Sequence, residues 1–258
     1  MRIGVCISIQ QQVAAVPGLD FLEGLVPDVL CPLETEAEFS RRLVAVRAMP
    51  LPMAAVNRLF PAEIKTTGPN VDVGAVDAYI ATVFRRAQRV GAKVVVFGAG
   101  PSRAVPEGFD RSAAWNQLAD GLRRWGPLAK NAGIVIVIEP LSRKETNIIN
   151  SVSEAAELAR CVNHPNIRIL ADTFHMGRDN EGVEGILAAG ADLLCHVHCA
   201  DPHERVPLGL GPADHRPYFR ALKDIGYAGR VCIEAIWRDF PAQLPAAVAA
   251  LRRQIETA

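Results

Sequence analysis

Eight short runs rich in β-branched residues alternate with helical patterns, and this alternation constrains the fold more than any other feature. The runs span residues 3–9, 20–26, 51–57, 93–98, 134–139, 167–172, 193–199 and 231–235. The clearest helical pattern covers residues 72–90, where apolar side chains recur every three or four positions at Val73, Val76, Ile80, Val83, Ala87 and Val90. Strands that alternate with helices predict a parallel sheet.

The number and the apolar character of these runs favour a closed sheet. IVIVI at 134–138 and VVV at 94–96 are almost continuously hydrophobic, which predicts that both faces of the sheet are covered. Eight βα units in 258 residues match a single (β/α)8 TIM barrel, so we expect one domain over residues 1–258. A doubly wound open sheet is the structural alternative. The segment DFLEGLVPDVLCP, which contains the second run, mixes strand and turn signals.

Three glycines support this division of the chain. Gly91, Gly133 and Gly226 each stand between a helical pattern and a strand, where a left-handed helix cap belongs. The segment GAGPSR at 98–103 follows a strand, but it lacks the third glycine of a dinucleotide-binding turn and contains a proline. We interpret it as a barrel loop near the substrate.

Charge and composition limit the classes of partner. Lysine plus arginine number 28, as do aspartate plus glutamate, so no basic excess indicates a nucleic-acid or membrane-surface partner. No apolar run reaches the length of a membrane span, and MRIGVCISIQ resembles a first strand rather than a signal peptide. We therefore expect a soluble, cytoplasmic protein. Its six cysteines form no CxxC motif and are expected to be reduced.

The last four strand-like runs each end on a residue that can bind a cation: Glu139, Asp172, His198 and Glu234. In a parallel barrel the carboxyl ends of all strands meet at one face, where the active sites of this fold lie. A carboxylate at the end of a buried strand is costly without a partner, and a shared cation would supply one. The sequence therefore predicts a metal site at this face, with His196 as a structural residue.

The donor set indicates which metals and substrates fit. Three carboxylates and one imidazole, without a thiolate, suit manganese, magnesium or cobalt better than a structural zinc. Four protein ligands leave room in an octahedral shell for two substrate oxygens. This arrangement favours a small, roughly neutral substrate with a vicinal hydroxy-ketone group.

Several segments resemble the sugar isomerase/epimerase superfamily of xylose-isomerase-like TIM barrels, especially its ketose 3-epimerase and hydroxypyruvate isomerase branch. The resemblance is carried by IEPLSRKETN, LADTFHMGRDNEG, HVHCADPHERVPLGLGPAD and VCIEA, and upstream by GLDFLE, LFPAEIKTTGPNVD and VVVFGAGPSRAVPEGFD. It covers most of the chain. It implies a divalent metal, with Mn2+ first and Mg2+ or Co2+ as alternatives, held by the same four residues that the strand ends select.

The resemblance also implies a chemical role for individual residues. Glu139 and Glu234 would face opposite sides of a substrate carbon and exchange its proton through a metal-stabilised enediolate. The substrate-binding residues would be Glu145, His175 and Arg205. One spacing differs, because Arg205 lies seven positions after His198 where the family usually has six, and His203 is the alternative for this loop position.

The predicted function is a divalent-metal-dependent sugar isomerase or epimerase whose partner is a small carbohydrate. Family barrels often form dimers or tetramers, which leaves a homo-oligomer open. A sugar or inosose dehydratase would use the same metal site. An apurinic-endonuclease-like hydrolase would need more metal-binding histidines and a basic DNA face, which this neutral chain lacks. A barrel that only binds sugar, the non-enzymatic alternative, would leave the carboxylates without a catalytic role.

Overall fold

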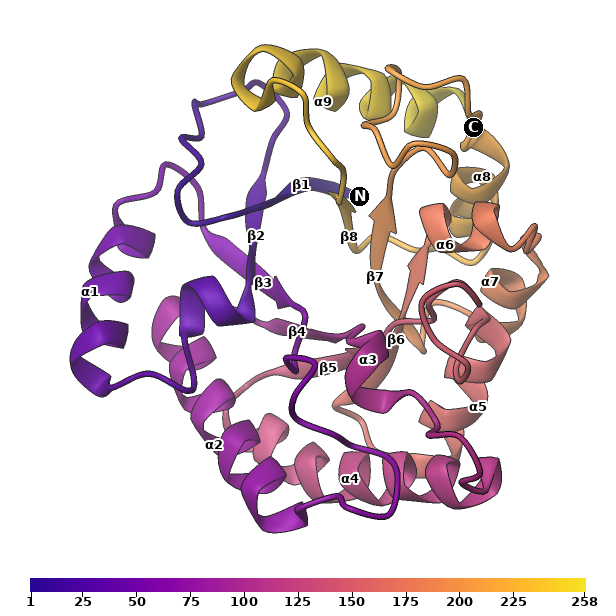
Figure 1. Ribbon diagram of the computed structural model, residues 1–258. Coiled ribbons are helices and arrows are strands. Elements are labelled where there is room, and N and C mark those ends of the chain that lie inside the picture. The colour runs from indigo at the N-terminus through magenta and orange to yellow at the C-terminus, as the bar shows by residue number, and fades with distance from the viewer.

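Each strand of the protein pairs in parallel with the next strand along the chain, and the last pairs with the first. This arrangement is seen in a computed structural model that describes residues 1–258. Figure 1 shows the strands at the centre and the helices outside them. The strands are β1 (Arg2–Ile7), β2 (Phe21–Leu25), β3 (Met53–Asn57), β4 (Val94–Phe97), β5 (Val135–Ile138), β6 (Ile167–Asp172), β7 (Leu194–Cys199) and β8 (Arg230–Ile233). The eight predicted strands and the single-domain TIM barrel are confirmed, and the pairing of β8 with β1 excludes the open sheet.

Helices follow every strand except β1, which a loop joins to β2. They are η1 (Val26–Leu30), α1 (Glu36–Arg47), α2 (Val73–Val90), α3 (Gly100–Arg103), α4 (Arg111–Asn131), α5 (Val152–Val162), α6 (Thr173–Arg178), α7 (Glu184–Ala189), α8 (Arg216–Asp224) and α9 (Phe240–Thr257). The helix predicted over 72–90 is confirmed as α2, with Asp72 as its N-cap. Gly91, Gly133 and Gly226 have φ values of 89°, 66° and 72°, so the predicted left-handed caps are also confirmed.

The mixed signals of DFLEGLVPDVLCP have a structural explanation. The segment is a strand, β2, followed directly by the π-helical turn η1. The backbone N–H of Cys31 donates to the carbonyl of Val26 at 3.0 Å, which closes this wider turn. The strand signal therefore belongs to Phe21–Leu25 and the turn signal to the adjacent Val26–Leu30.

The inside of the barrel changes from apolar to polar along the strands. A separate apolar cluster consists of strand residues alone: Ala55, Val94, Val96, Val137 and Leu170. Because alternate residues of a strand share a face, the next inward position after Val137 is Glu139, and after Leu170 it is Asp172. The apolar layer thus forms a floor beneath the polar residues at the carboxyl ends. The main core of 64 buried residues includes the helix residues that pack around the barrel.

All six cysteines are free thiols in the structure. Of its helices, none combines the length and the apolar character that crossing a bilayer would require.

A buried histidine should make the fold sensitive to acid. His215 precedes α8, is 1% exposed, and places Nδ1 2.8 Å from Thr173 Oγ1. Burial lowers the pKa of His215 from 6.5 to about 4, although Asp201 and Asp214 act in the opposite direction. Because the unfolded chain takes up this proton at higher pH than the folded protein, stability should fall as pH drops from about 6.5 through about 4.

We expect this group to account for about 2 to 3 kcal/mol of acid-induced loss in the free energy of unfolding. His215→Gln should remove that component, so urea unfolding at about pH 7.5 and about pH 4.5, with a chelator present, should show a smaller loss in the variant. His203→Gln, at an exposed histidine, is the control and should behave like the unsubstituted protein. Equal losses in all three proteins would contradict the prediction.

Candidate metal centre and active site

Four side chains from consecutive strands converge at the carboxyl end of the barrel. Glu139 follows β5, Asp172 ends β6, His198 lies in β7 and Glu234 follows β8. Their potential ligand atoms all lie within 4.8 Å of one another. The structure therefore brings together all four residues that the sequence predicts as metal ligands.

The contacts within this cluster fit a cation. Asp172 Oδ1 accepts a hydrogen bond from the backbone N–H of Phe174, but its Oδ2 is buried and lacks a hydrogen-bond partner. His198 Nδ1 lies 3.1 Å from Glu139 Oε1 and 3.2 Å from Glu234 Oε2. Burial raises the pKa of both Glu139 and Asp172. These groups could hold a divalent ion, which would give the unpartnered oxygen a partner and reduce the repulsion between carboxylates.

Glu234 is held at both of its oxygens. Asn57 Nδ2 donates to Oε1 at 3.3 Å, and Arg205 Nη2 donates to Oε2 at 2.8 Å. Burial tends to raise the pKa of Glu234, but His198 and Arg205 outweigh it and hold the value at about 2. The carboxylate is therefore oriented and ionised.

A fourth acid, Glu23 on β2, lies beneath the cluster, and the sequence predicts no role for it. Its side chain is 0% exposed, and its two oxygens lie 2.8 Å from His198 Nε2 and 2.7 Å from His196 Nε2. His196, which was predicted to be structural, thus contacts the same carboxylate as His198. The available signal was the carboxylate of GLDFLE in the middle of an apolar strand, where an acid needs a buried partner.

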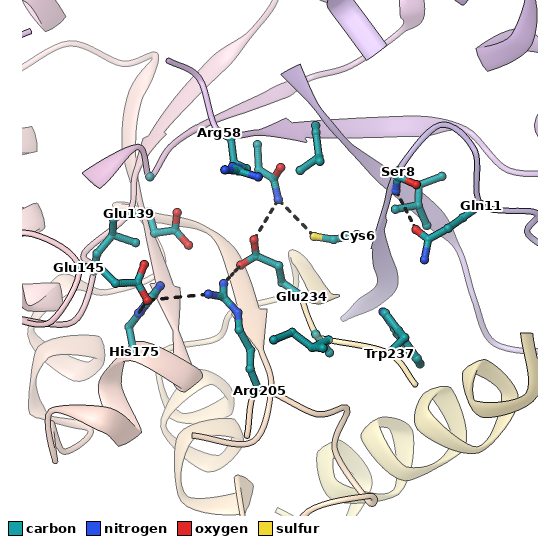
Figure 2. Close-up of a pocket in the computed structure, with 17 residues that line it drawn as sticks. Cys6, Ser8, Gln11, Arg58, Glu139, Glu145, His175, Arg205, Glu234 and Trp237 are labelled. Carbon is teal, nitrogen blue, oxygen red and sulfur yellow. Dashed lines mark hydrogen bonds and ion pairs between the residues drawn. The ribbon is translucent and has the colours of Figure 1, made fainter. Parts of the chain in front are cut away.

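The cluster opens into a pocket of about 450 Å³, shown in Figure 2. Glu145, His175 and Arg205, the predicted substrate-binding residues, all line this pocket. Arg205 also lies 3.9 Å from Glu145, whereas His203 is exposed and is not among the lining residues. The structure therefore places Arg205, and not His203, at the loop position that the sequence left open.

His175 connects the pocket to the cluster. Its Nδ1 accepts a hydrogen bond from the backbone N–H of Ser142 at 3.2 Å, so the ring proton of the neutral form resides on Nε2. That Nε2 faces Asp172 Oδ2 at 3.5 Å. Burial lowers the pKa of His175, despite the nearby carboxylates of Asp172 and Glu145. The imidazole is thus buried, neutral and oriented.

Comparison with known proteins identifies the family. A family model described as "Xylose isomerase-like TIM barrel" matches residues 54–255. The chain belongs to this family.

Relatives of this xylose isomerase-like barrel include sugar epimerases. It is 30% identical over 130 residues to a D-psicose 3-epimerase of Ruminiclostridium cellulolyticum, and 37% identical over 123 residues to an L-ribulose 3-epimerase of Methylomonas sp.. These matches span 44% and 40% of the relatives, and 50% and 48% of this chain. A solved D-allulose 3-epimerase from Methylomonas sp. superposes with a TM-score of 0.80 and 22% identity, over 98% of both chains. The structural likeness supports the shared fold.

In this xylose isomerase-like barrel, the GAGPSR segment contributes one residue to the pocket lining and one that hydrogen-bonds the backbone next to it. Gly98 lines the pocket, which agrees with the interpretation of this segment as a loop near the substrate. Arg103 is completely buried, and its guanidinium donates to the backbone carbonyls of Phe97 at 2.7 Å and Glu139 at 2.6 Å. It thereby ties the end of β4 to the end of β5. The sequence pattern of GAGPSR does not predict this role for Arg103.

Gly98 is required by the position of Glu139. A Cβ atom at residue 98 would overlap Glu139 Oε2, so Gly98→Ala should displace the carboxylate. Binding of Mn2+, measured by titration calorimetry, should weaken at least about tenfold, while the protein remains folded.

Gly74→Ala is the matched control, because its added Cβ would meet Asp72 Oδ1 at an ordinary 3.6 Å. It should bind Mn2+ like the unsubstituted protein. Unchanged Mn2+ affinity in Gly98→Ala would show that Glu139 is not a ligand or that it adapts freely.

Proposed function

We propose that the protein is a divalent-metal-dependent sugar epimerase that exchanges a proton on a ketose, of the ketose 3-epimerase type. The observation that carries the proposal is the convergence of Glu139, Asp172, His198 and Glu234 within 4.8 Å of one another. Two of the four, Glu139 and Glu234, also line the pocket. The names of the curated relatives support the choice of a ketose as substrate. Mn2+ is the expected metal, with Mg2+ or Co2+ as alternatives.

The four clustered residues would hold the metal, His198 through the Nδ1 atom that faces the carboxylates. When bound, a divalent ion supplies positive charge that acidifies a proton next to a carbonyl and stabilises the negative oxygen of an enediolate. Three carboxylates against a double positive charge leave about one negative charge, and Arg205 lies beside Glu234 to offset it.

Glu139 and Glu234 are the proposed pair for proton exchange. Both line the pocket, and they come from strands separated by two others around the barrel. One would remove the proton from the substrate carbon and the other would return a proton to the opposite side. Glu234 is held by Asn57 and Arg205, whereas Glu139 makes its side-chain contact with His198. The two carboxylates therefore have different surroundings, which is expected if one removes a proton and the other returns one.

The remaining pocket residues would position the sugar. Glu145 can accept a hydrogen bond from a hydroxyl group, and Arg205 and the Nε2–H of His175 can donate to substrate oxygens. Ile236 and Trp237 provide an apolar wall on the β8 side of the pocket. Such a wall excludes water from the reacting carbon and strengthens the polar contacts.

Glu23 is proposed as a positioning residue. Its Oε1 lies 2.8 Å from His198 Nε2 and would accept the N–H at that atom, so that Nδ1, which is directed at the cluster, is the ring nitrogen left to bind a metal. Because the same carboxylate also contacts His196, the ring of His198 is fixed from below. Glu23 does not line the pocket, so it would act through His198 and not on the substrate.

The function is tested with free and phosphorylated ketoses in deuterated water with added Mn2+. Solvent deuterium should appear at carbon 3, and removing the metal with a chelator should stop the exchange. New unsaturated or keto-deoxy products would instead identify a dehydratase. Absence of both exchange and dehydration across the panel would count against an enzyme of this class.

Replacing either proposed acid or base should remove turnover. Glu139→Gln and Glu234→Gln should each lower kcat for deuterium exchange by about a thousandfold or more, because the amide cannot take up the proton. Glu204→Gln is the control, since Glu204 is an exposed acid in the loop after β7 and should retain the original kcat. Full turnover by either of the first two variants would refute the proton-transfer roles.

Glu23→Gln should act mainly on the metal. An amide at this position can donate to Nε2 and so favour the wrong tautomer of His198, which should weaken Mn2+ binding by about 10- to 100-fold. The readout is calorimetric titration of the full-length protein with Mn2+. Glu23→Asp, which keeps the carboxylate, should recover part of the affinity. Equal affinity in Glu23→Gln and the unsubstituted protein would leave Glu23 with a packing role only.

A further inference from the structure

Beneath the proposed metal centre lies a second cluster of donor atoms, and this one contains sulfur. Cys6 of β1 and Cys232 of β8 place their Sγ atoms 3.6 Å apart. Glu23 belongs with Cys6 and His198 to one group of potential metal ligands. It belongs with Cys232 and His196 to another, and within each group the ligand atoms lie within 4.8 Å of one another. The cluster therefore combines two thiols with a carboxylate and two imidazoles.

The strand register disfavours a disulfide between the two thiols. Cys232 pairs with Gly4, so Cys6 lies two residues further along the neighbouring strand. From the rise and spacing of strands, this offset puts the two Cα atoms about 8 Å apart, which is beyond the reach of a disulfide. The sulfur atoms approach each other although the backbones do not, and both cysteines are free thiols.

The distance between the two sulfur atoms suits a shared ion. Two thiolates bound to a tetrahedral Zn2+ at about 2.3 Å each are about 3.8 Å apart, close to the separation of Cys6 and Cys232. Two sulfur ligands and a carboxylate favour a soft or borderline ion such as Zn2+ or Cd2+. The three carboxylates of the proposed metal centre favour a harder ion. The two clusters should therefore select different metals.

The pocket gives access to this cluster through Cys6. Cys232 is 0% exposed, whereas Cys6 is partly exposed and lines the pocket. Figure 2 shows the sulfur of Cys6 beside the amide of Asn57, whose Nδ2 lies 3.4 Å from it. Burial raises the pKa of both thiols, so they carry protons in the metal-free protein. An ion that arrives through the pocket would displace these protons, as thiolate ligation requires.

We propose that Cys6, Cys232 and Glu23 form a second metal site, for a thiophilic ion of the Zn2+ or Cd2+ class. The two oxygens of Glu23 now lie 2.8 Å from His198 Nε2 and 2.7 Å from His196 Nε2. An ion that takes a carboxylate oxygen would loosen the contact that orients His198. Occupation of the second site should therefore weaken Mn2+ binding at the proposed metal centre. The site itself does not depend on the proposed function.

Titration of the Mn2+-loaded, full-length protein with Cd2+ tests the site, with the thiols kept reduced. Cd2+ is the probe because its bond to a thiolate produces a charge-transfer absorption in the ultraviolet, which carboxylate and imidazole ligands do not produce. We expect this absorption to saturate at one Cd2+ per chain. Binding of Cd2+ without the thiolate absorption would place the ion at the carboxylate cluster and overturn the proposal.

Variants at the two cysteines assign the absorption. Cys6→Ser and Cys232→Ser should each lower the affinity for Cd2+ by at least about a hundredfold. Cys232→Ala, which adds no buried hydroxyl group, is the second variant if Cys232→Ser does not fold. Cys161→Ser is the matched control, because Cys161 is an exposed thiol on α5, and it should keep the absorption. Absorption that is unchanged in Cys6→Ser, or lost in Cys161→Ser, would overturn the site.

The effect on Mn2+ tests the coupling between the two sites. Saturating Cd2+ should lower the affinity of the unsubstituted protein for Mn2+ by at least about tenfold. The loss should be smaller in Cys6→Ser, whereas direct competition at the carboxylate cluster would lower the affinity of both proteins equally. An equal loss would therefore overturn the coupling.

The outcomes separate this proposal from the proposed function. Thiolate absorption that depends on Cys6 and Cys232, without deuterium exchange on any ketose, would leave the second site standing while the epimerase fails. Deuterium exchange without thiolate absorption would do the reverse.

Discussion

Repulsion between buried carboxylates is the interaction on which the rest of the site depends. Glu139 and Asp172 are buried and Glu234 is partly buried, and like charges placed so close together are costly. The neighbouring groups reduce this cost from different directions: Arg205 pairs with Glu234, and Glu23 holds the far side of His198. The proposed divalent ion would provide most of the remaining compensation.

The closed barrel makes this convergence possible through the two-residue period of its strands. Val137 and Leu170 point into the floor of the barrel, and the residues two positions later, Glu139 and Asp172, point into its mouth. Closure of the barrel brings the strand ends together, so the alternation along each strand is enough to place potential ligands next to one another. A polar residue at a strand end thus acquires neighbours that lie far away in sequence.

This geometry explains how much could be predicted from the sequence. The strand-end residues were predictable because their position in a run gives both their depth and their direction. Glu23 and Arg103 were not assigned, because their partners, the histidines of β7 and the carbonyls after β4 and β5, follow no local pattern. The choice of Arg205 over His203 depended on the path of one loop, which places Arg205 in the left-handed region at φ 56°.

The same reasoning separates the parts of the pocket that the barrel positions from the parts that its loops supply. The part of the pocket where the metal is proposed is built on strand ends, whose positions the barrel fixes. Another part of the lining comes from the ends of β1, β2 and β3 and from the loops after β1 and β3, and the fold places few demands on side chains in such loops. Asn57 of β3 donates to Glu234 and Glu23 of β2 contacts His198, so the ends of β2 and β3 take part in orienting the carboxylate cluster although neither supplies one of its four residues.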